Sequence, residues 1–205
     1  ASNYGTYLQD NFGLLNRYYL DLGLRMDYNT AFGDQVGWQA YPKIGMSYIV
    51  SEEPWMQKLV DNKWVNSLKL MANYGVAGSY PPAFEYMRAV ETSSYLDKQA
   101  NAFGKIGNPN LGPEKKRSYE FGFQGDFFHN VLSLGFTYYY AITKDALFNV
   151  PTLPSSGQSS SYLANIGRIR NRGIEMYVGL NIINTREWGL SCRTSINTND
   201  NKVLY

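Results

Sequence analysis

Hydrophobic and polar residues alternate along most of this chain with a period of two. The clearest stretch covers residues 131–143, where every second residue is large and apolar and the residues between them are mostly small or polar. The apolar set is Leu132, Leu134, Phe136, Tyr138, Tyr140 and Ile142. Because successive side chains of a β-strand point to opposite faces, this pattern predicts a strand with one apolar face and one polar face.

The same alternation recurs along the chain and predicts about eight strands, with no convincing amphipathic helix. The alternating segments are roughly 3–12, 17–28, 41–51, 67–76, 118–127, 131–143, 174–182 and 190–197. Between two of these segments, we expect a tight two-residue hairpin turn at His129-Asn130. We also expect one short helical turn within residues 52–62.

The predicted connections alternate in length. Short turns are expected at 13–16, 129–130 and 185–187, and longer loops at about 30–38, 78–114 and 149–165. An antiparallel meander with tight turns at one end and long loops at the other is typical of an outer-membrane β-barrel. Long loops without secondary structure of their own are often functional, so these loops are where we look for binding residues.

Alternation alone does not distinguish a membrane barrel from a soluble antiparallel sheet, which also has one apolar face. Three features favour the barrel. Several strands have 10–14 residues, which is enough to cross a bilayer at a tilt. The polar face carries many charged residues, as in a water-filled lumen. Tyr and Trp lie near strand ends, as in the aromatic girdles of membrane barrels. We therefore predict an all-β, antiparallel, up-and-down transmembrane β-barrel, with a large β-sandwich as the alternative.

Charged residues of the alternating segments fall on the predicted polar face, which would line the lumen of a barrel. They are Arg17, Asp21, Arg25, Asp27, Lys69, Glu120, Asp126, Glu175 and Arg193. We expect most of them to form cross-strand pairs that hold the wall together, and a minority to contact a substrate.

Composition narrows the possible functions. The 205 residues have a mean hydropathy of -0.38 and no apolar run near 18 residues, which excludes a membrane-spanning helix but not a barrel, whose strands average to a polar score. A net charge of +2 gives no argument for nucleic-acid binding. With one histidine, His129, and one cysteine, Cys192, the chain cannot assemble a zinc site or a Ser-His-Asp triad, so we predict no metal, no cofactor and no catalytic residue.

Several short strings occur in a specific order along the chain. They include Arg17-Tyr18-Tyr19-Leu20, Leu24-Arg25-Met26-Asp27, Ser51-Glu52-Glu53-Pro54-Trp55, Asn73-Tyr74-Gly75-Val76-Ala77-Gly78, Asn108-Pro109-Asn110-Leu111-Gly112-Pro113-Glu114, Thr143-Lys144-Asp145 and Asn171-Arg172-Gly173-Ile174-Glu175. This ordered set covers nearly the whole chain. It resembles the C-terminal barrel half of TonB-dependent outer-membrane transporters, in particular the SusC/RagA-like branch.

The resemblance implies a barrel of about 22 strands that crosses the bacterial outer membrane many times. In this family a plug and a TonB-contacting segment precede the barrel. TonB delivers energy for the import of a large nutrient, such as an oligosaccharide, a peptide or a chelate. SusC-like members usually pair with a SusD-like surface lipoprotein that acts as a lid.

Residues 1–205 show no plug-like sequence and no TonB box. We therefore expect them to form part of a single outer-membrane β-barrel domain, with about eight of its strands. Such a wall would contact outer-membrane lipid and lipopolysaccharide.

Five aromatic residues in the predicted loop 78–114 are candidates for contact with a nutrient or with the lid. They are Tyr80, Phe84, Tyr86, Tyr95 and Phe103. Aromatic rings stack on sugars and pack against peptides, and loops commonly carry specificity. The alternative is that these rings pack the loop against itself.

Arg168, Arg170 and Arg172 share one parity and should point the same way. Two interpretations are open: a solvated row of charges at the extracellular rim, or a rim that binds an anionic group of a substrate or of lipopolysaccharide. In the same segment, Asn171-Arg172-Gly173 predicts a kink or β-bulge at the glycine.

Two other classes of function stay open on the sequence. A cell-surface β-sandwich that does not transport would serve as a binding or adhesion module. A β-rich carbohydrate-active enzyme would need two convergent carboxylates. Acidic residues occur singly on the predicted polar face, so the sequence favours a protein that is not an enzyme.

Overall fold

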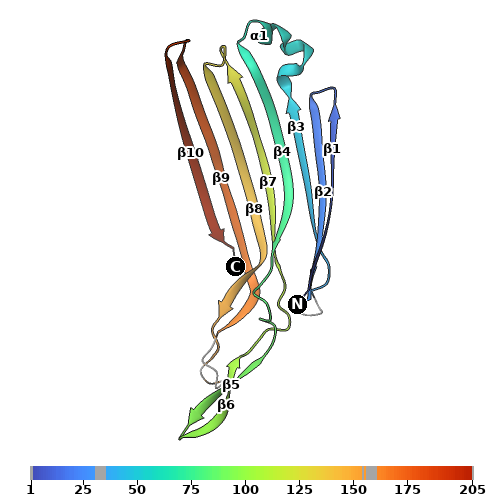
Figure 1. Ribbon diagram of the computed structural model, residues 1–205, viewed down its shortest axis with the longest axis vertical. Helices are drawn as coiled ribbons and strands as arrows, with labels where there is room; N and C mark the ends of the chain where they lie inside the picture. Colours follow the sequence, from blue (N-terminus) through green and yellow to red (C-terminus); the bar gives the residue numbers. More distant parts are fainter. Residues whose placement is uncertain (1, 31–35, 154, 156–160, 205) are drawn as a thin grey trace.

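The computed structural model describes residues 2–30, 36–153, 155 and 161–204. These form one eight-stranded antiparallel sheet and a separate two-stranded hairpin (Figure 1). The order of strands in the large sheet is β1-β2-β3-β4-β7-β8-β9-β10, as expected for an up-and-down meander. Its strands are β1 (Asn3–Leu14), β2 (Tyr18–Asn29), β3 (Gln39–Ile49), β4 (Val65–Ser79), β7 (Glu114–Phe127), β8 (Leu132–Val150), β9 (Tyr162–Asn184) and β10 (Gly189–Val203). The eight predicted strands are therefore confirmed.

Two of the strands are much longer than alternation predicts. β8 has 19 residues and β9 has 23, so their connection is shorter than the predicted loop 149–165. Alternation did not predict the extension of β9, because Arg168, Arg170 and Arg172 occupy positions where an alternating strand would have apolar residues.

The predicted loop 78–114 contains regular structure of its own. β5 (Ala89–Tyr95) and β6 (Lys98–Lys105) pair with each other as an antiparallel hairpin that extends beyond the long-loop end of the sheet (Figure 1). The β5 sequence, with few apolar residues, gives no clear alternation. The description of this whole segment as a loop is therefore corrected.

A compact helical segment joins β3 to β4 at the tight-turn end (Figure 1). It consists of η2 (Val50–Glu52), η3 (Pro54–Met56) and α1 (Gln57–Asp61), which confirms a helical turn within residues 52–62 and adds further turns to it. Pro54 suits the first position of η3, where its missing N–H is not needed. No helix among the described residues is long and apolar enough to cross a membrane.

The turn between β7 and β8 is confirmed in place but is longer than predicted. It covers residues 128–131 and brings Phe128, His129 and Asn130 in succession to positive φ, at 54°, 60° and 63°. The backbone N–H of Val131 donates to the carbonyl oxygen of Phe128 at 3.1 Å and closes the turn. His129 therefore has a turn role, since this conformation is set by the chain reversal.

The sheet is a single layer with two chemically different faces. Residues directly opposite each other on paired strands share a face, so the strand register assigns every position to one side. The apolar face carries, among others, Leu22, Ile44, Tyr74, Tyr119, Phe123, Phe136, Tyr138, Ile174, Met176 and Leu180. The polar face carries, among others, Asp21, Lys69, Asn73, Glu120, Asp126, Thr137, Glu175 and Arg193.

Nothing in the described part of the chain covers the apolar face. Two of its members, Met46 and Phe121, are each 57% exposed, and no large side chain among the described residues is fully buried. A β-sandwich requires a second sheet packed face to face with the first. The single layer therefore argues against the sandwich and leaves a broad apolar surface of the kind that contacts lipid.

Candidate functional site

Charged residues of the polar face form a partial network across the strands. Asp21 on β2 lies 3.5 Å from the Lys43 ammonium on β3, and it accepts a hydrogen bond of 2.9 Å from the Gln9 side-chain amide on β1. The expected cross-strand pairing is thus present here. In contrast, Lys69, Glu120 and Glu175 form no ion pair within the described residues.

Asp126 joins three neighbouring strands on the polar face. Its carboxylate accepts a hydrogen bond of 2.8 Å from the Ser67 hydroxyl on β4 and one of 2.7 Å from the Ser133 hydroxyl on β8. Hydrogen bonds to a charged acceptor are stronger than neutral ones. This residue therefore has a structural role in the wall, as expected for the lumen-side charges.

A polar pocket lies toward the long-loop ends of β2, β3 and β4. The Nε–H of Arg25 donates to both carboxylate oxygens of Asp27 at 2.9 Å, and Tyr41 and Tyr80 lie beside this pair. Together with Asn3, Asn29 and residues 76–78, these side chains line a cavity of about 330 Å³. The structure thus brings Tyr80, one of the five predicted contact residues, to a charged and aromatic concavity.

The other predicted aromatics do not join Tyr80 in this pocket. Phe84 is 49% exposed in a turn, where its own φ is 63°, and the N–H of Met87 donates to its carbonyl oxygen at 3.1 Å. Tyr86 is half-buried in the same turn. Tyr95 and Phe103 lie on β5 and β6, and their side chains are outside the described part of the structure.

Asn165 on β9 secures the segment that leads into β7. Its side-chain amide accepts from the Gly112 N–H at 2.7 Å and donates to the Gly112 and Asp145 carbonyl oxygens at 2.8 and 2.7 Å. Nearby, the Asn108 amide donates to the Leu163 carbonyl oxygen at 3.0 Å. The sequence did not single out Asn165 as a clamp, because its partners lie 20 and 53 residues away in the chain.

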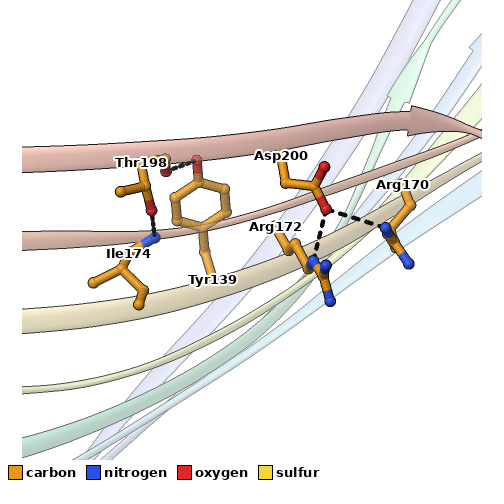
Figure 2. A network of polar contacts seen from close by, with 6 residues as sticks. All are labelled: Tyr139, Arg170, Arg172, Ile174, Thr198 and Asp200. Atoms are coloured by element: carbon orange, nitrogen blue, oxygen red, sulfur yellow. Dashed lines mark hydrogen bonds and ion pairs between the residues drawn. The ribbon is translucent and has the colours of Figure 1, made fainter.

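The predicted arginine row lies on the apolar face, since its members alternate in step with Ile174 and Met176. The side chains of Arg170 and Arg172 converge on Asp200 of β10 at 3.1 and 2.8 Å (Figure 2). Asp200 was not among the predicted residues, because this ion pair exists only when β9 and β10 are in register. Arg168 precedes the pair on the same face.

The β-bulge predicted at Gly173 is absent. β9 pairs in unbroken register with β8 and β10 through residues 171–173. Instead, the Tyr139 side chain passes over this glycine, and its hydroxyl donates to the Thr198 carbonyl oxygen at 3.2 Å (Figure 2). A Cβ at position 173 would collide with both groups, so the glycine permits a close approach rather than a change of strand register.

The described residues hold no group of three or more His, Cys, Asp and Glu side chains that could bind a metal ion. Cys192 is a free thiol on β10. The polar and aromatic groups described above are charged pairs, tyrosine hydroxyls and exposed rings.

Comparison with known proteins gives the family. The model of the TonB dependent receptor-like β-barrel family matches residues 1–203. The chain belongs to this family. It is 28% identical over 199 residues to TonB-dependent receptor P26 of Formosa agariphila, and 25% identical over 204 residues to TonB-dependent receptor SusC of Bacteroides thetaiotaomicron. These alignments cover 95% and 93% of this chain and 20% of each relative, so the chain spans about a fifth of their length.

Solved structures of the family share the fold. The RagAB peptide transporter superposes with a TM-score of 0.87 at 24% identity, over 98% of this chain and 22% of that one. The siderophore receptor PirA of Pseudomonas aeruginosa gives a TM-score of 0.67 at 17% identity, over 97% and 32%. The predicted SusC/RagA-like resemblance and the antiparallel barrel-wall fold are therefore confirmed, with the eight strands forming an open arc. The family is one of receptors and transporters, which removes the support for the enzyme class.

Proposed function

We propose that this chain forms part of the wall of an outer-membrane importer that takes up a large nutrient with energy from TonB. The observation that carries the proposal is the single-layer sheet with one apolar and one polar face, in a chain that belongs to the TonB-dependent family. The apolar face contacts lipid, and the polar face lines the passage for the nutrient. Residues 1–205 are part of a single barrel domain.

The long-loop end is the extracellular end, where the nutrient and a SusD-like lipoprotein lid make contact. Three observations support this orientation: the β5–β6 hairpin extends from that end, the Arg25-Asp27-Tyr41-Tyr80 pocket lies there, and the opposite end has short turns, as periplasmic turns do in such barrels. We assign Tyr80 to nutrient contact inside the wall. Phe84, Tyr86, Tyr95 and Phe103 are assigned to the lid or to the nutrient beneath it.

Growth of a strain that lacks the complete protein tests the importer directly. The expected result is loss of growth on one class of large nutrient, with growth on its small breakdown products retained. Deletion of an adjacent lipoprotein gene should reduce the same uptake. Normal growth of the deletion strain on every oligosaccharide, peptide and chelate source tested would contradict import as the function.

Two matched variants locate the contacts. Tyr80→Ala should weaken nutrient uptake while the lipoprotein still copurifies, because Tyr80 lies in the lumen-side pocket. Phe84→Ala should reduce copurification of the lipoprotein, because its ring is exposed in the long-loop segment. Tyr4→Ala, which removes an exposed ring far from this loop in the sequence, is the control and should change neither readout.

A further inference from the structure

A cluster of basic side chains interrupts the apolar face toward the long-loop ends of β7, β8 and β9. We propose that this basic patch, formed by Lys115, Arg117, Lys144, Arg168 and Arg170, binds the phosphate groups of lipopolysaccharide in the outer leaflet. The proposal rests on the proposed function only in placing the wall in the outer membrane. It adds a lipid-binding site on the face opposite to the nutrient passage.

The strand register brings the basic patch together from three strands. Lys115 on β7 lies opposite Lys144 on β8, and Lys144 lies opposite Arg168 on β9. In the row next to it, Arg117 lies opposite Ile142, which lies opposite Arg170. Neighbouring strands are about 5 Å apart and alternate residues about 7 Å apart, so the charges converge on an area the size of one or two phosphate groups.

Three of the five members of the basic patch have no ion-pair partner among the described residues. Like charges directly opposite each other on paired strands are destabilising. Asp200 pairs with Arg170 and Arg172, while Lys115, Arg117 and Lys144 form no ion pair among the described residues. An external anion that lies between the three strands would remove this repulsion, and guanidinium groups match phosphate oxygens in a bidentate manner.

The depth of the basic patch points to a lipid headgroup as the source of the anion. On β8 the apolar positions run from Leu132 to Ile142, which is about 34 Å along the strand and about 25 Å in height at a tilt near 45°. Lys144 is the next position on that face. Directly opposite tyrosines, Tyr119 and Tyr140, lie just before the cations, as expected for an interfacial aromatic girdle.

This arrangement also separates the basic patch from the nutrient. A solute in the lumen meets the polar face, where Lys116 points, whereas its neighbours Lys115 and Arg117 point to the opposite side. The surface continuous with the basic patch is the exposed apolar face that contacts lipid. Phosphate carried on a lipid is therefore the ligand that fits both the charge and the position.

Binding of lipid A to the complete purified protein in detergent tests the proposal. The probes are diphosphorylated lipid A and the same lipid with its phosphates removed, and native mass spectrometry measures the bound fraction. The triple variant K115Q/R117Q/K144Q should bind diphosphorylated lipid A about 100-fold more weakly, since each basic residue near an anionic surface contributes about fivefold. Among the described residues, none of the three side chains has an acidic partner that its substitution would leave uncompensated, so the fold should persist, and the melting temperature checks this.

The control variant K69Q/K116Q/R193Q removes three charges from the polar face. It should change lipid A affinity by less than about twofold. Equal losses in both triple variants would overturn the proposal, as would equal binding of the two lipids by the unaltered protein. Competition by millimolar inorganic phosphate would also overturn it, because the site would then be one for free phosphate. Should the triple variant fail to fold, the single variant Lys144→Gln is compared with Lys116→Gln in the same assay.

Nutrient uptake measured on the same variants keeps the two proposals apart. Uptake should survive in K115Q/R117Q/K144Q, because the altered side chains face away from the lumen. Lipid A binding without nutrient uptake by the unaltered protein would contradict the importer and leave the lipid site standing. Uptake without phosphate-dependent lipid binding would do the reverse.

Discussion

The two faces of the sheet are built from the same strands but are specified in different ways. On the apolar face, the rings of Phe123 and Phe136 stack with their centroids 5.9 Å apart, and the ring centroids of Tyr74 and Tyr119 lie 5.0 Å apart. Nothing in the described structure packs over these rings. On the polar face, individual groups meet specific partners, as Asp126 meets two serine hydroxyls. Lipid is a fluid solvent and requires only that the first face be apolar. The second face depends on the fit of particular side chains.

Glycine and tyrosine show this difference most clearly. Gly135 lies directly opposite Tyr177 on the polar face, and a Cβ at position 135 would collide with the Tyr177 ring. On β10, the other strand that pairs with β9, the Arg193 guanidinium lies 6.0 Å from the centroid of the Tyr177 ring. Gly173 and Tyr139 repeat the arrangement four residues further along the same pair of strands, with the glycine on β9 and the tyrosine on β8. The polar face is thus close-packed at intervals.

The largest expected effect comes from a charge in the middle of the apolar face. Phe136→Arg should lower the free energy of unfolding in a bilayer by about 2–4 kcal/mol, because an arginine near the midplane loses its hydration. Thr137→Arg, on the next residue and the opposite face, should change it by less than about 1 kcal/mol. Urea unfolding of the complete protein in lipid vesicles measures both. Equal losses would mean that the face assignment is wrong.

A smaller effect is expected from a methyl group on the polar face. Gly135→Ala should destabilise the protein by about 1–3 kcal/mol, because the added carbon displaces the Tyr177 ring from its packed position. The matched control is Gly75→Ala on the same face, where a Cβ would meet nothing within 4 Å. That variant should be neutral or slightly more stable. If both behaved alike, close packing on the polar face would be disproved.

The smallest effect is expected at the tight-turn end, where side chains from both faces meet. Arg17 and Tyr18 are consecutive, so their side chains start on opposite sides. Both nevertheless reach Glu53: the Arg17 guanidinium lies 3.0 Å from Oε2, and the Tyr18 hydroxyl lies 2.6 Å from Oε1. The hydrogen bond from the Tyr18 hydroxyl is the main reason that the pKa of the Glu53 carboxyl lies below its usual range. The charged form of Glu53 is therefore favoured in the folded protein.

The pH dependence of Glu53→Gln follows from the direction of this shift. A lowered folded-state pKa contributes stability that is present above the ordinary glutamate pKa of about 4.3 and is lost as the pH falls through the folded-state value. The variant should melt a few degrees lower than the unaltered protein at pH 7, and this gap should close as the pH falls below about 4. Glu52→Gln, on an exposed neighbour, is the control and should show no such gap. A gap that stays constant from pH 7 to pH 3 would exclude the ionised pair as its cause.

Much of the fold could be predicted from local pattern. Alternation located all eight strands and their faces, because each strand is apolar on one side over most of its length. It failed where side chains depart from that rule. The extension of β9 through Arg168, Arg170 and Arg172 was missed because these cations lie on the otherwise apolar face, and the β5–β6 hairpin was missed because it lies off the sheet.

The candidate site could be predicted only in part. The sequence identified Tyr80 and the arginine row but not their partners. Asp200 and Asn165 acquire their roles from residues 20 to 53 positions away, and such pairs follow from the strand register. The side chains of Tyr95 and Phe103 fall outside the described structure, so their contact with a nutrient or lid stays a prediction.

The sequence by itself determined that this protein is a wall of amphipathic strands, since a period of two is a local property that needs no knowledge of neighbours. It also determined the family, through the order of its short strings. Only the tertiary structure decided which charges lie together. Lys115, Lys144 and Arg168 are far apart in the chain, and they become one basic patch because hydrogen bonding between strands fixes which residue lies opposite which.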